Sequence, residues 1–129
     1  MGLITVDIRN RRPIYEQLTE KIEQLVIAGI LKENDQLPSV RSLASELTVN
    51  PNTIQKAYNE LEHSGIISSL PGRGSFITGN IARITEEKKA DLLKEFSLLA
   101  KKVLNAGISG EELSEIIKHI RETEEQNHA

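Results

Sequence analysis

The stretch from Leu37 to Thr78 decides the fold, and it contains Leu-Pro-Ser-Val-Arg at 37–41, Val-Asn-Pro-Asn-Thr-Ile at 49–54 and Pro-Gly-Arg-Gly-Ser-Phe-Ile-Thr at 71–78. The first two motifs are typical of helix starts, and the third is typical of a β-hairpin turn with its returning strand. Two short helices followed by a hairpin predict a helix-turn-helix with a wing. In that arrangement one helix can enter a DNA major groove while the hairpin tip touches the neighbouring groove or backbone.

Both helix starts in this stretch are explicit. Ser39 is expected to cap the first of the two helices, because its hydroxyl can accept a backbone N–H. Asn50 is the expected cap of the second helix and Pro51 its first residue, while Val49 and Ile54 form the apolar pair that packs across the start. The apolar residues predicted to face inward from this second helix are Ile54, Ala57, Tyr58 and Leu61.

The outward face of the second helix carries hydrogen-bonding side chains, concentrated in its first two turns. These side chains are Asn52, Thr53, Gln55, Lys56 and Asn59. Amides can pair with adenine in the major groove, and hydroxyls can reach bases or phosphates. The pattern predicts a DNA-recognition helix.

Predicted strands at 66–70 and 74–78 flank the Pro71-Gly72 turn, which combines a fixed φ with a positive φ. Glycine at the tip lets the backbone approach nucleic acid closely, and Arg73 adds a cation there. The Gly-Arg-Gly triplet is not a dinucleotide-binding fingerprint, because a strand and not a helix follows it. The hairpin is therefore predicted to be a wing that contacts DNA.

A further helix is expected ahead of this stretch, beginning near Pro13 and ending at Gly29. Its apolar side chains recur at helical spacing and need a partner surface. The helix that follows Ser39 offers one, so the two helices are predicted to pack together. The residues that would supply that surface are Val40, Leu43, Ala44 and Leu47.

Residues 81–129 predict two longer helices. Thr85 is expected to cap the first, because the acidic residues after it suit the positive end of a helix dipole. The run Asn-Ala-Gly at 105–107 should end that helix, and Ser109 with Glu112 forms a capping box for the next. The two apolar stripes are too wide to bury each other alone, which predicts pairing with a second copy of the chain. The predicted dimerization residues are Leu92, Phe96, Leu99, Val103, Leu113, Ile116, Ile117 and Ile120.

These elements predict an α+β chain of two domains. Residues 1–80 would form a winged helix-turn-helix of three helices plus a β-hairpin wing, and residues 81–129 a two-helix dimerization hairpin. A length of 129 residues excludes a large multidomain enzyme. A symmetric dimer would present two recognition helices to half-sites about 34 Å apart, or a multiple of this, which predicts a palindromic operator in double-stranded DNA.

Composition excludes several other classes of protein. The chain has no cysteine, so a disulfide framework, a thiolate metal site and a thiol nucleophile are all excluded. The three histidines lack metal-ligand spacing, and no catalytic residue set is recognisable. No apolar stretch approaches the roughly 20 residues of a membrane span. We therefore expect a cytoplasmic protein that is not an enzyme, with no cofactor, no metal and no membrane contact.

The charge balance weighs against nucleic-acid binding. The net charge is −3, with 8 basic and 9 acidic residues in 1–80 and 8 basic and 10 acidic residues in 81–129. Because phosphate contacts need cations, DNA binding would depend on a few placed side chains and not on a broad positive field. The candidate cations are Arg41, Lys56 and Arg73, with Arg9, Arg11 and Arg12 as further ones.

Residues from about 13 to 78 resemble the winged helix-turn-helix domain of GntR-family bacterial transcription regulators, especially the YtrA-like subgroup. The motifs that carry the resemblance are Pro-Ile-Tyr-Glu-Gln at 13–17, Leu-Pro-Ser-Val-Arg at 37–41, Val-Asn-Pro-Asn-Thr at 49–53, Lys-Ala-Tyr at 56–58 and Gly-Arg-Gly-Ser-Phe at 72–76. Asn34 departs from the family, which usually has glycine there. Pro51 also departs, because many relatives have a basic residue at that position.

The resemblance implies which residues contact DNA and what the protein controls. The implied contacts are Arg41, Asn52, Thr53, Gln55, Gly72 and Arg73, with Ser39, Lys56 and Tyr58 as weaker candidates for phosphate contact. The resemblance further implies a repressor that dimerizes through its C-terminal helices. Control of an ABC-type transporter operon is implied as well.

Each candidate has a structural alternative. Arg41 could be an ordinary surface charge, Asn52 and Gln55 could be solvated helix residues, and Arg73 could be a turn cation without a partner. Tyr58 is interpreted first as a core residue. For the whole chain, the alternative is a winged-helix module that binds protein instead of DNA, which salt would affect far less. A small-molecule effector could bind between the two parts, although no cluster of residues marks a pocket.

Overall fold

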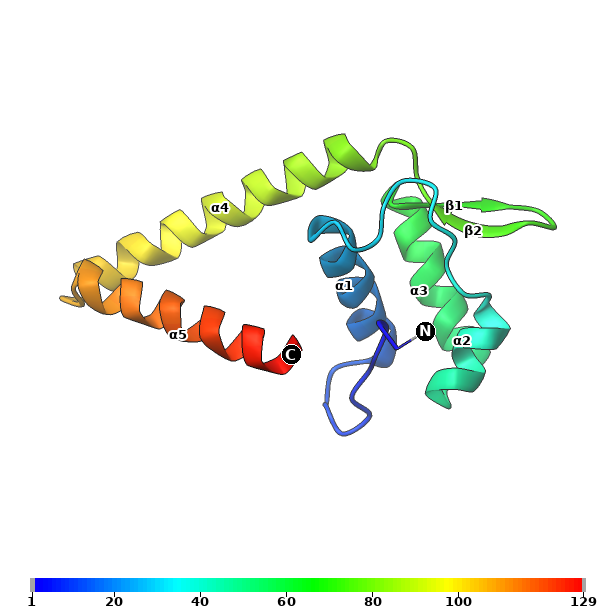
Figure 1. Cartoon of the computed structure of the whole chain (residues 1–129), viewed down its shortest axis with the longest axis horizontal. Coiled ribbons are helices and arrows are strands. Elements are labelled where there is room, and N and C mark those ends of the chain that lie inside the picture. The colour runs from blue at the N-terminus through cyan, green and yellow to red at the C-terminus, as the bar shows by residue number, and fades with distance from the viewer. Residues whose placement is uncertain (1, 129) are drawn as a thin grey trace. The chain divides into compact units, whose positions relative to one another are not determined.

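The computed structural model describes residues 2–128, and within this range the chain forms five helices and two strands (Figure 1). In chain order these are α1 (Ile14–Ile27), α2 (Val40–Leu47), α3 (Pro51–His63), β1 (Ile67–Leu70), β2 (Gly74–Ile77), α4 (Ile81–Asn105) and α5 (Gly110–His128). The predicted α+β fold is confirmed. The chain divides into two compact units, Met1–Lys89 and Ala90–Ala129. None of the described helices is both long and apolar enough to cross a membrane.

The N-terminal ends of α2 and α3 are capped by the residues predicted to cap them. Ser39 Oγ accepts a hydrogen bond from the backbone N–H of Ser42 at 3.0 Å, and Asn50 Oδ1 accepts one from that of Asn52 at 2.8 Å. Pro51 is the first residue of α3, where its missing N–H costs no helical hydrogen bond. These local bonds fix where both helices begin.

Glycines end α1 and α3 as predicted. Gly29 and Gly65 follow the last turns with φ values of 78° and 83°, a backbone conformation that other residues rarely adopt. After each glycine the next N–H bonds back to a carbonyl of the last turn, from Ile30 to Leu25 and from Ile66 to Leu61, both at 2.9 Å. Helix α1 begins at Ile14, with Pro13 just outside it, so its start also agrees with the prediction.

The core of the first unit is built around α3. Helices α1 and α2 were predicted to pack together; their apolar side chains share one core, but each of them packs mainly against α3. Helix α2 is eight residues long and buries Leu43 and Ala44, while Val40 and Leu47 pack partly buried against the same core. The buried side chains of the unit are Ile4, Leu18, Ile22, Leu25, Val26, Leu31, Leu37, Leu43, Ala44, Ile54, Ala57, Tyr58, Leu61, Ile66, Ile67, Ile77 and Ile81.

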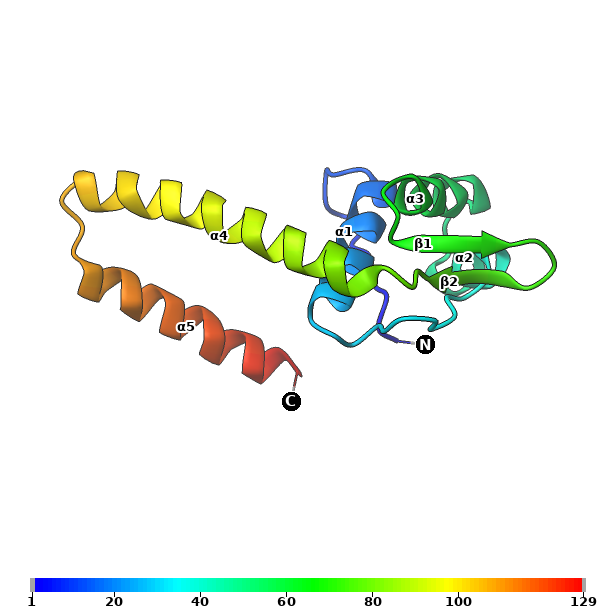
Figure 2. The ribbon, with the colours of Figure 1, turned by 90° about the horizontal axis from the view of Figure 1, so that it is seen from above.

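Strands β1 and β2 form an antiparallel hairpin, the wing, which Figure 2 shows from above. The pairs run from Ile67 opposite Ile77 to Leu70 opposite Gly74. Each strand is therefore one residue shorter than predicted, at the end that lies away from the turn. The N–H of Arg73 donates to the carbonyl of Leu70 at 2.9 Å. The intervening Gly72 has a φ of 75°, as a type II turn with proline before glycine requires.

Helix α4 begins earlier than predicted. The helix starts at Ile81, so the predicted cap residue Thr85 lies inside it. Ile81 is buried and Ile84 packs against the same core, so burial extends the helix by a turn ahead of the acidic residues. An ion pair of 2.6 Å between Lys88 and Glu23 joins this part of α4 to α1.

In the second unit the predicted helix ends are confirmed, and the apolar stripes lie open. Helix α4 ends at Asn105, Gly107 follows with a φ of 91°, and Ser109 Oγ accepts from the N–H of Glu112 at 3.1 Å. Val103 and Leu113, next to the turn, are half-buried. The large apolar side chains farther along the two helices are about half exposed in the single chain, namely Leu92, Phe96, Leu99, Ile116, Ile117 and Ile120.

Candidate nucleic-acid interface

A cleft of about 550 Å³ lies between α3, the start of α2 and the wing. Of the residues predicted to contact DNA, the cleft brings together Ser39 from the α2 start, Gln55 and Tyr58 from α3, and Gly72 with Arg73 from the wing tip. Arg41, Asn52, Thr53 and Lys56 do not line it. Gln36 does line it, although no sequence pattern singled this residue out.

Helix α3 presents its polar face because its apolar face is fixed in the core. Ile54, Ala57, Tyr58 and Leu61 are buried, which leaves the predicted outward residues on the opposite side. Asn52, Gln55 and Lys56 are exposed and Thr53 is half-buried. The side chain of Gln55 is oriented by its neighbour one turn on, since its Nε2 donates to Asn59 Oδ1 at 2.8 Å.

Tyr58 anchors α3 to the segment that precedes α2. Its side chain is buried, and its hydroxyl donates to the carbonyl oxygen of Pro38 at 2.7 Å. Burial raises the pKa of Tyr58, so the phenol stays neutral far above physiological pH. Tyr58 is a core residue, as its position on the apolar stripe predicted.

The start of α2 carries two of the predicted contacts. Ser39 is exposed, and although its oxygen accepts the capping bond from Ser42, its hydroxyl hydrogen can still be donated. Arg41 is exposed in the first turn of the helix. Backbone N–H groups and a cation at a helix start are both suited to a phosphate.

Lys56 lies over an aromatic ring, which the sequence did not predict. Its Nζ is 3.8 Å from the ring centroid of Tyr15, which lies in the first turn of α1. At an exposed site such a cation–π contact is worth about 0.5–1 kcal/mol, so it can orient the lysine without holding it firmly. The two residues are distant in sequence, and no local pattern connects them.

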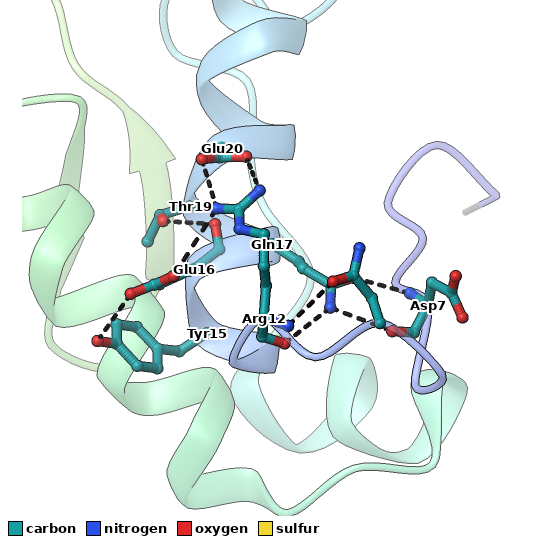
Figure 3. Close-up of polar contacts among 8 residues, drawn as sticks. Asp7, Arg12, Tyr15, Glu16, Gln17, Thr19 and Glu20 are labelled. Carbon is teal, nitrogen blue, oxygen red and sulfur yellow. Dashed lines mark hydrogen bonds and ion pairs between the residues drawn. The ribbon is translucent and has the colours of Figure 1, made fainter.

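Arg12 forms ion pairs with carboxylates of α1, as Figure 3 shows. Its Nη1 donates to Glu20 Oε2 at 2.7 Å and its Nη2 to Glu20 Oε1 at 2.5 Å, while Glu16 lies 3.8 Å away. The hydrogen-bonded guanidinium lowers the pKa of Glu20. All three N-terminal arginines proposed as cations are exposed, and Arg12 is already balanced by acid.

Gln17 holds the arginine-bearing segment in place, a role that no sequence pattern indicates (Figure 3). Its Oε1 accepts from the N–H of Asp7 at 2.8 Å, and its Nε2 donates to the carbonyls of Asp7 and Arg12, each at 3.1 Å. One side chain on α1 therefore closes the loop that displays Arg9 and Arg11. An amide can do this because it both donates and accepts.

Residues 14–77 match the family model described as bacterial regulatory proteins of the gntR family. The transcriptional repressor YtrA of Bacillus subtilis is 42% identical over 120 residues, which cover 93% of this chain and 91% of YtrA. The chain belongs to the GntR family. Because the match to YtrA covers nearly the whole chain, this GntR regulator is also YtrA-like beyond its winged helix.

Other regulators with solved structures have a similar fold. A transcriptional regulator from Oenococcus oeni is 40% identical, with a TM-score of 0.71 over 89% of this chain and 96% of that one. The DNA-binding domain of AraR, crystallised in complex with an operator, is 26% identical, with a TM-score of 0.50 over 57% of this chain and 89% of that one. This GntR protein is a transcriptional regulator, and the relatives are named as regulators and not as enzymes.

Proposed function

We propose that this GntR regulator represses transcription by binding a palindromic operator as a homodimer. The observation that carries the proposal is the cleft that joins the outward face of α3, at Gln55, to the wing tip, at Gly72 and Arg73. YtrA is named a repressor, and the AraR domain is seen on an operator, which supports the same role here.

Base contacts are assigned to the first two turns of α3. Asn52 and Gln55 are exposed amides, and an amide can donate and accept at once on the major-groove edge of adenine. Thr53 is half-buried, so only its outer atoms would reach a base, by hydrogen bond or through its methyl group. These three residues would give the protein its sequence preference.

Phosphate contacts are assigned to residues around that helix. Arg41 and Ser39 at the start of α2, together with Lys56 on α3, would meet the backbone on either side of the major groove. Gly72 and Arg73 would reach the next groove or its phosphates from the wing. With three cations per protomer in these roles, the logarithm of affinity should fall with the logarithm of salt at a slope of about −3 per protomer.

The base contacts can be tested by selecting binding sequences from a random pool with the purified protein. Gln55→Ala and Thr53→Ala should each lose preference at a defined base pair, at a cost of about 1–3 kcal/mol for a good contact. Gln24→Ala on the exposed face of α1 serves as the matched control. Unaltered preference in both variants would refute the assignment.

The same preparation separates DNA binding from a protein-docking role. A DNA complex should form in dilute buffer and weaken steeply as salt is raised, whereas an apolar protein interface would respond far less. If no fragment of genomic DNA is bound even at low salt, the proposal fails. In that case, docking to another protein would be the better interpretation of the α3 face.

The dimer is assigned to the open apolar stripes of α4 and α5. Phe96 and Leu99 on α4 and Ile116 and Ile120 on α5 are each half exposed or more in the single chain. Monomeric proteins rarely leave so continuous an apolar face in water, and a twofold partner presenting the same face would cover it. Two copies of α3 would then address two half-sites related by the same symmetry.

The proposed target is an operon for an ABC-type transporter, as the resemblance to YtrA-like regulators implies. Sequencing the genomic fragments that the protein retains would identify it. Release of those fragments by a solute of the encoded transporter would reveal a small-molecule effector. Fragments without such genes would contradict the assignment of the target.

A further inference from the structure

The segment ahead of α2 runs along the outer edge of the wing. Gln36 forms an isolated antiparallel bridge with Phe76, and the N–H of Leu37 donates to the carbonyl of Ser75 at 2.9 Å. On the other side of this bridge, the N–H of Ile77 donates to the carbonyl of Asp35 at 2.8 Å. The wing strand β2 is therefore hydrogen-bonded on both sides, to β1 and to this segment.

The side chain of Gln36 extends this contact to the wing tip. Its Nε2 donates to the carbonyl oxygen of Arg73 at 3.0 Å. The adjacent Gly74 has a φ of 113°, and a Cβ built there would lie 2.8 Å from that same nitrogen. The amide of Gln36 thus lies in the space that a Cβ at position 74 would enter, and the positive φ of Gly74 favours glycine there.

The same segment is tied on its other side to the recognition helix. The hydroxyl of Tyr58, on α3, donates to the carbonyl oxygen of Pro38 at 2.7 Å. Residues 36–38 therefore connect α3 to the carbonyl of Arg73 through two side-chain hydrogen bonds. Gln36 and Gln55 both line the cleft between these elements.

We propose that Gln36 is a positioning residue for DNA binding, which holds the wing-tip backbone so that Arg73 and the α3 face reach the duplex together. The inference rests on the proposed contact between Arg73 and DNA. Without the bond from Gln36, the three residues between β1 and β2 would have to be ordered when DNA binds, and that ordering would lower the affinity.

The test is a double-mutant cycle on operator affinity with the full-length protein. Gln36→Met keeps the length of the side chain and removes the donor, and Arg73→Ala removes the cation. Gln36→Met alone should lower affinity about 2- to 10-fold, the worth of one hydrogen bond, and should lower the urea midpoint only slightly because the bond is exposed. In the Arg73→Ala background it should cause little further loss. Gln24→Met on α1 is the matched control and should change neither quantity.

Each other outcome overturns a stated part of the argument. If Arg73→Ala leaves affinity unchanged, the proposed wing contact fails, and the role of Gln36 fails with it. If Arg73→Ala weakens binding but Gln36→Met does not, DNA binding by the wing stands and the inference about Gln36 is wrong. If the two losses simply add, Gln36 acts on DNA directly and is not a positioning residue. Gln36→Glu, which places a carboxylate against the carbonyl of Arg73, should lose at least as much affinity as Gln36→Met.

Discussion

Among single residues, Thr48 combines a β-branched side chain with a left-handed backbone. It ends α2 with φ 57° and ψ 47°, while the next N–H, of Val49, bonds back to Ala44 at 3.0 Å. Such a conformation costs a non-glycine residue about 1–3 kcal/mol. Thr48→Gly should therefore raise the free energy of unfolding, by about 1 kcal/mol after the entropy of glycine is subtracted, as measured by urea denaturation.

Thr85 is the control for this substitution, since it lies inside α4. There a glycine relieves no strain and weakens the helix, so Thr85→Gly should lower the free energy of unfolding by several tenths of a kcal/mol. A loss of stability at both positions would show that Thr48 is not strained.

Tyr58→Phe should be destabilising, because it leaves the carbonyl of Pro38 without its buried donor. The expected loss is about 1–3 kcal/mol in the free energy of unfolding at neutral pH. Burial also raises the pKa of Tyr58, so the unfolded chain loses this proton first. The contribution is therefore complete below about pH 10, the pKa of a free tyrosine, and declines as pH rises above it.

Urea titrations at about pH 7 and about pH 11 check this, since free tyrosine ionises between them. The wild-type protein should lose more stability between them than the Tyr58→Phe variant does. Parallel losses in the two proteins would contradict the assignment of the alkaline effect to Tyr58.

Asn34 has a left-handed backbone conformation, which accounts for one departure of this sequence from its family. It has a φ of 69°, and asparagine tolerates this conformation better than other non-glycine residues. This explains why asparagine can stand where the family usually has glycine, a departure visible in the sequence but not explained by it. The caps Ser39, Asn50 and Ser109 were predictable because each acts on a neighbour two or three positions away.

Among the elements, α3 has two asparagines at its start, which are expected to have different roles. Asn50 caps the helix and Asn52, two positions on, is exposed and proposed to contact DNA. Asn50→Ala should lower the free energy of unfolding by about 1 kcal/mol, as removal of an N-cap does, measured by urea denaturation. Asn52→Ala should leave stability nearly unchanged and weaken operator binding. An equal effect of the two substitutions on stability would contradict the capping role.

Elements were predictable where local signals set them and not where tertiary packing did. Helix α3 and the turn at Gly72 follow from capping and turn residues alone. The start of α4 does not, because Ile81 is held by the core of the first unit. The contacts of Gln36 with Arg73 and of Lys56 with Tyr15 join distant segments, so a pattern along the chain could not reveal them.

For the whole molecule, operator binding should depend on the apolar faces of α4 and α5. Leu99→Asp places a charge on the predicted interface and should produce monomers, measured by sedimentation or light scattering, with much weaker operator affinity. Leu98→Asp is the matched control, because Leu98 is equally exposed but lies on another face of the helix. A dimer that survives Leu99→Asp would place the pairing surface elsewhere.

The contact between Lys56 and Tyr15 offers a way to follow DNA binding by tyrosine fluorescence. The chain has no tryptophan and two tyrosines, and only Tyr15 lies beside a cation that is assigned to a DNA phosphate. Tyr58 is enclosed in the core. If Lys56 leaves the ring for a phosphate, the ultraviolet emission of Tyr15 should change, so operator occupancy could be followed without attaching a dye.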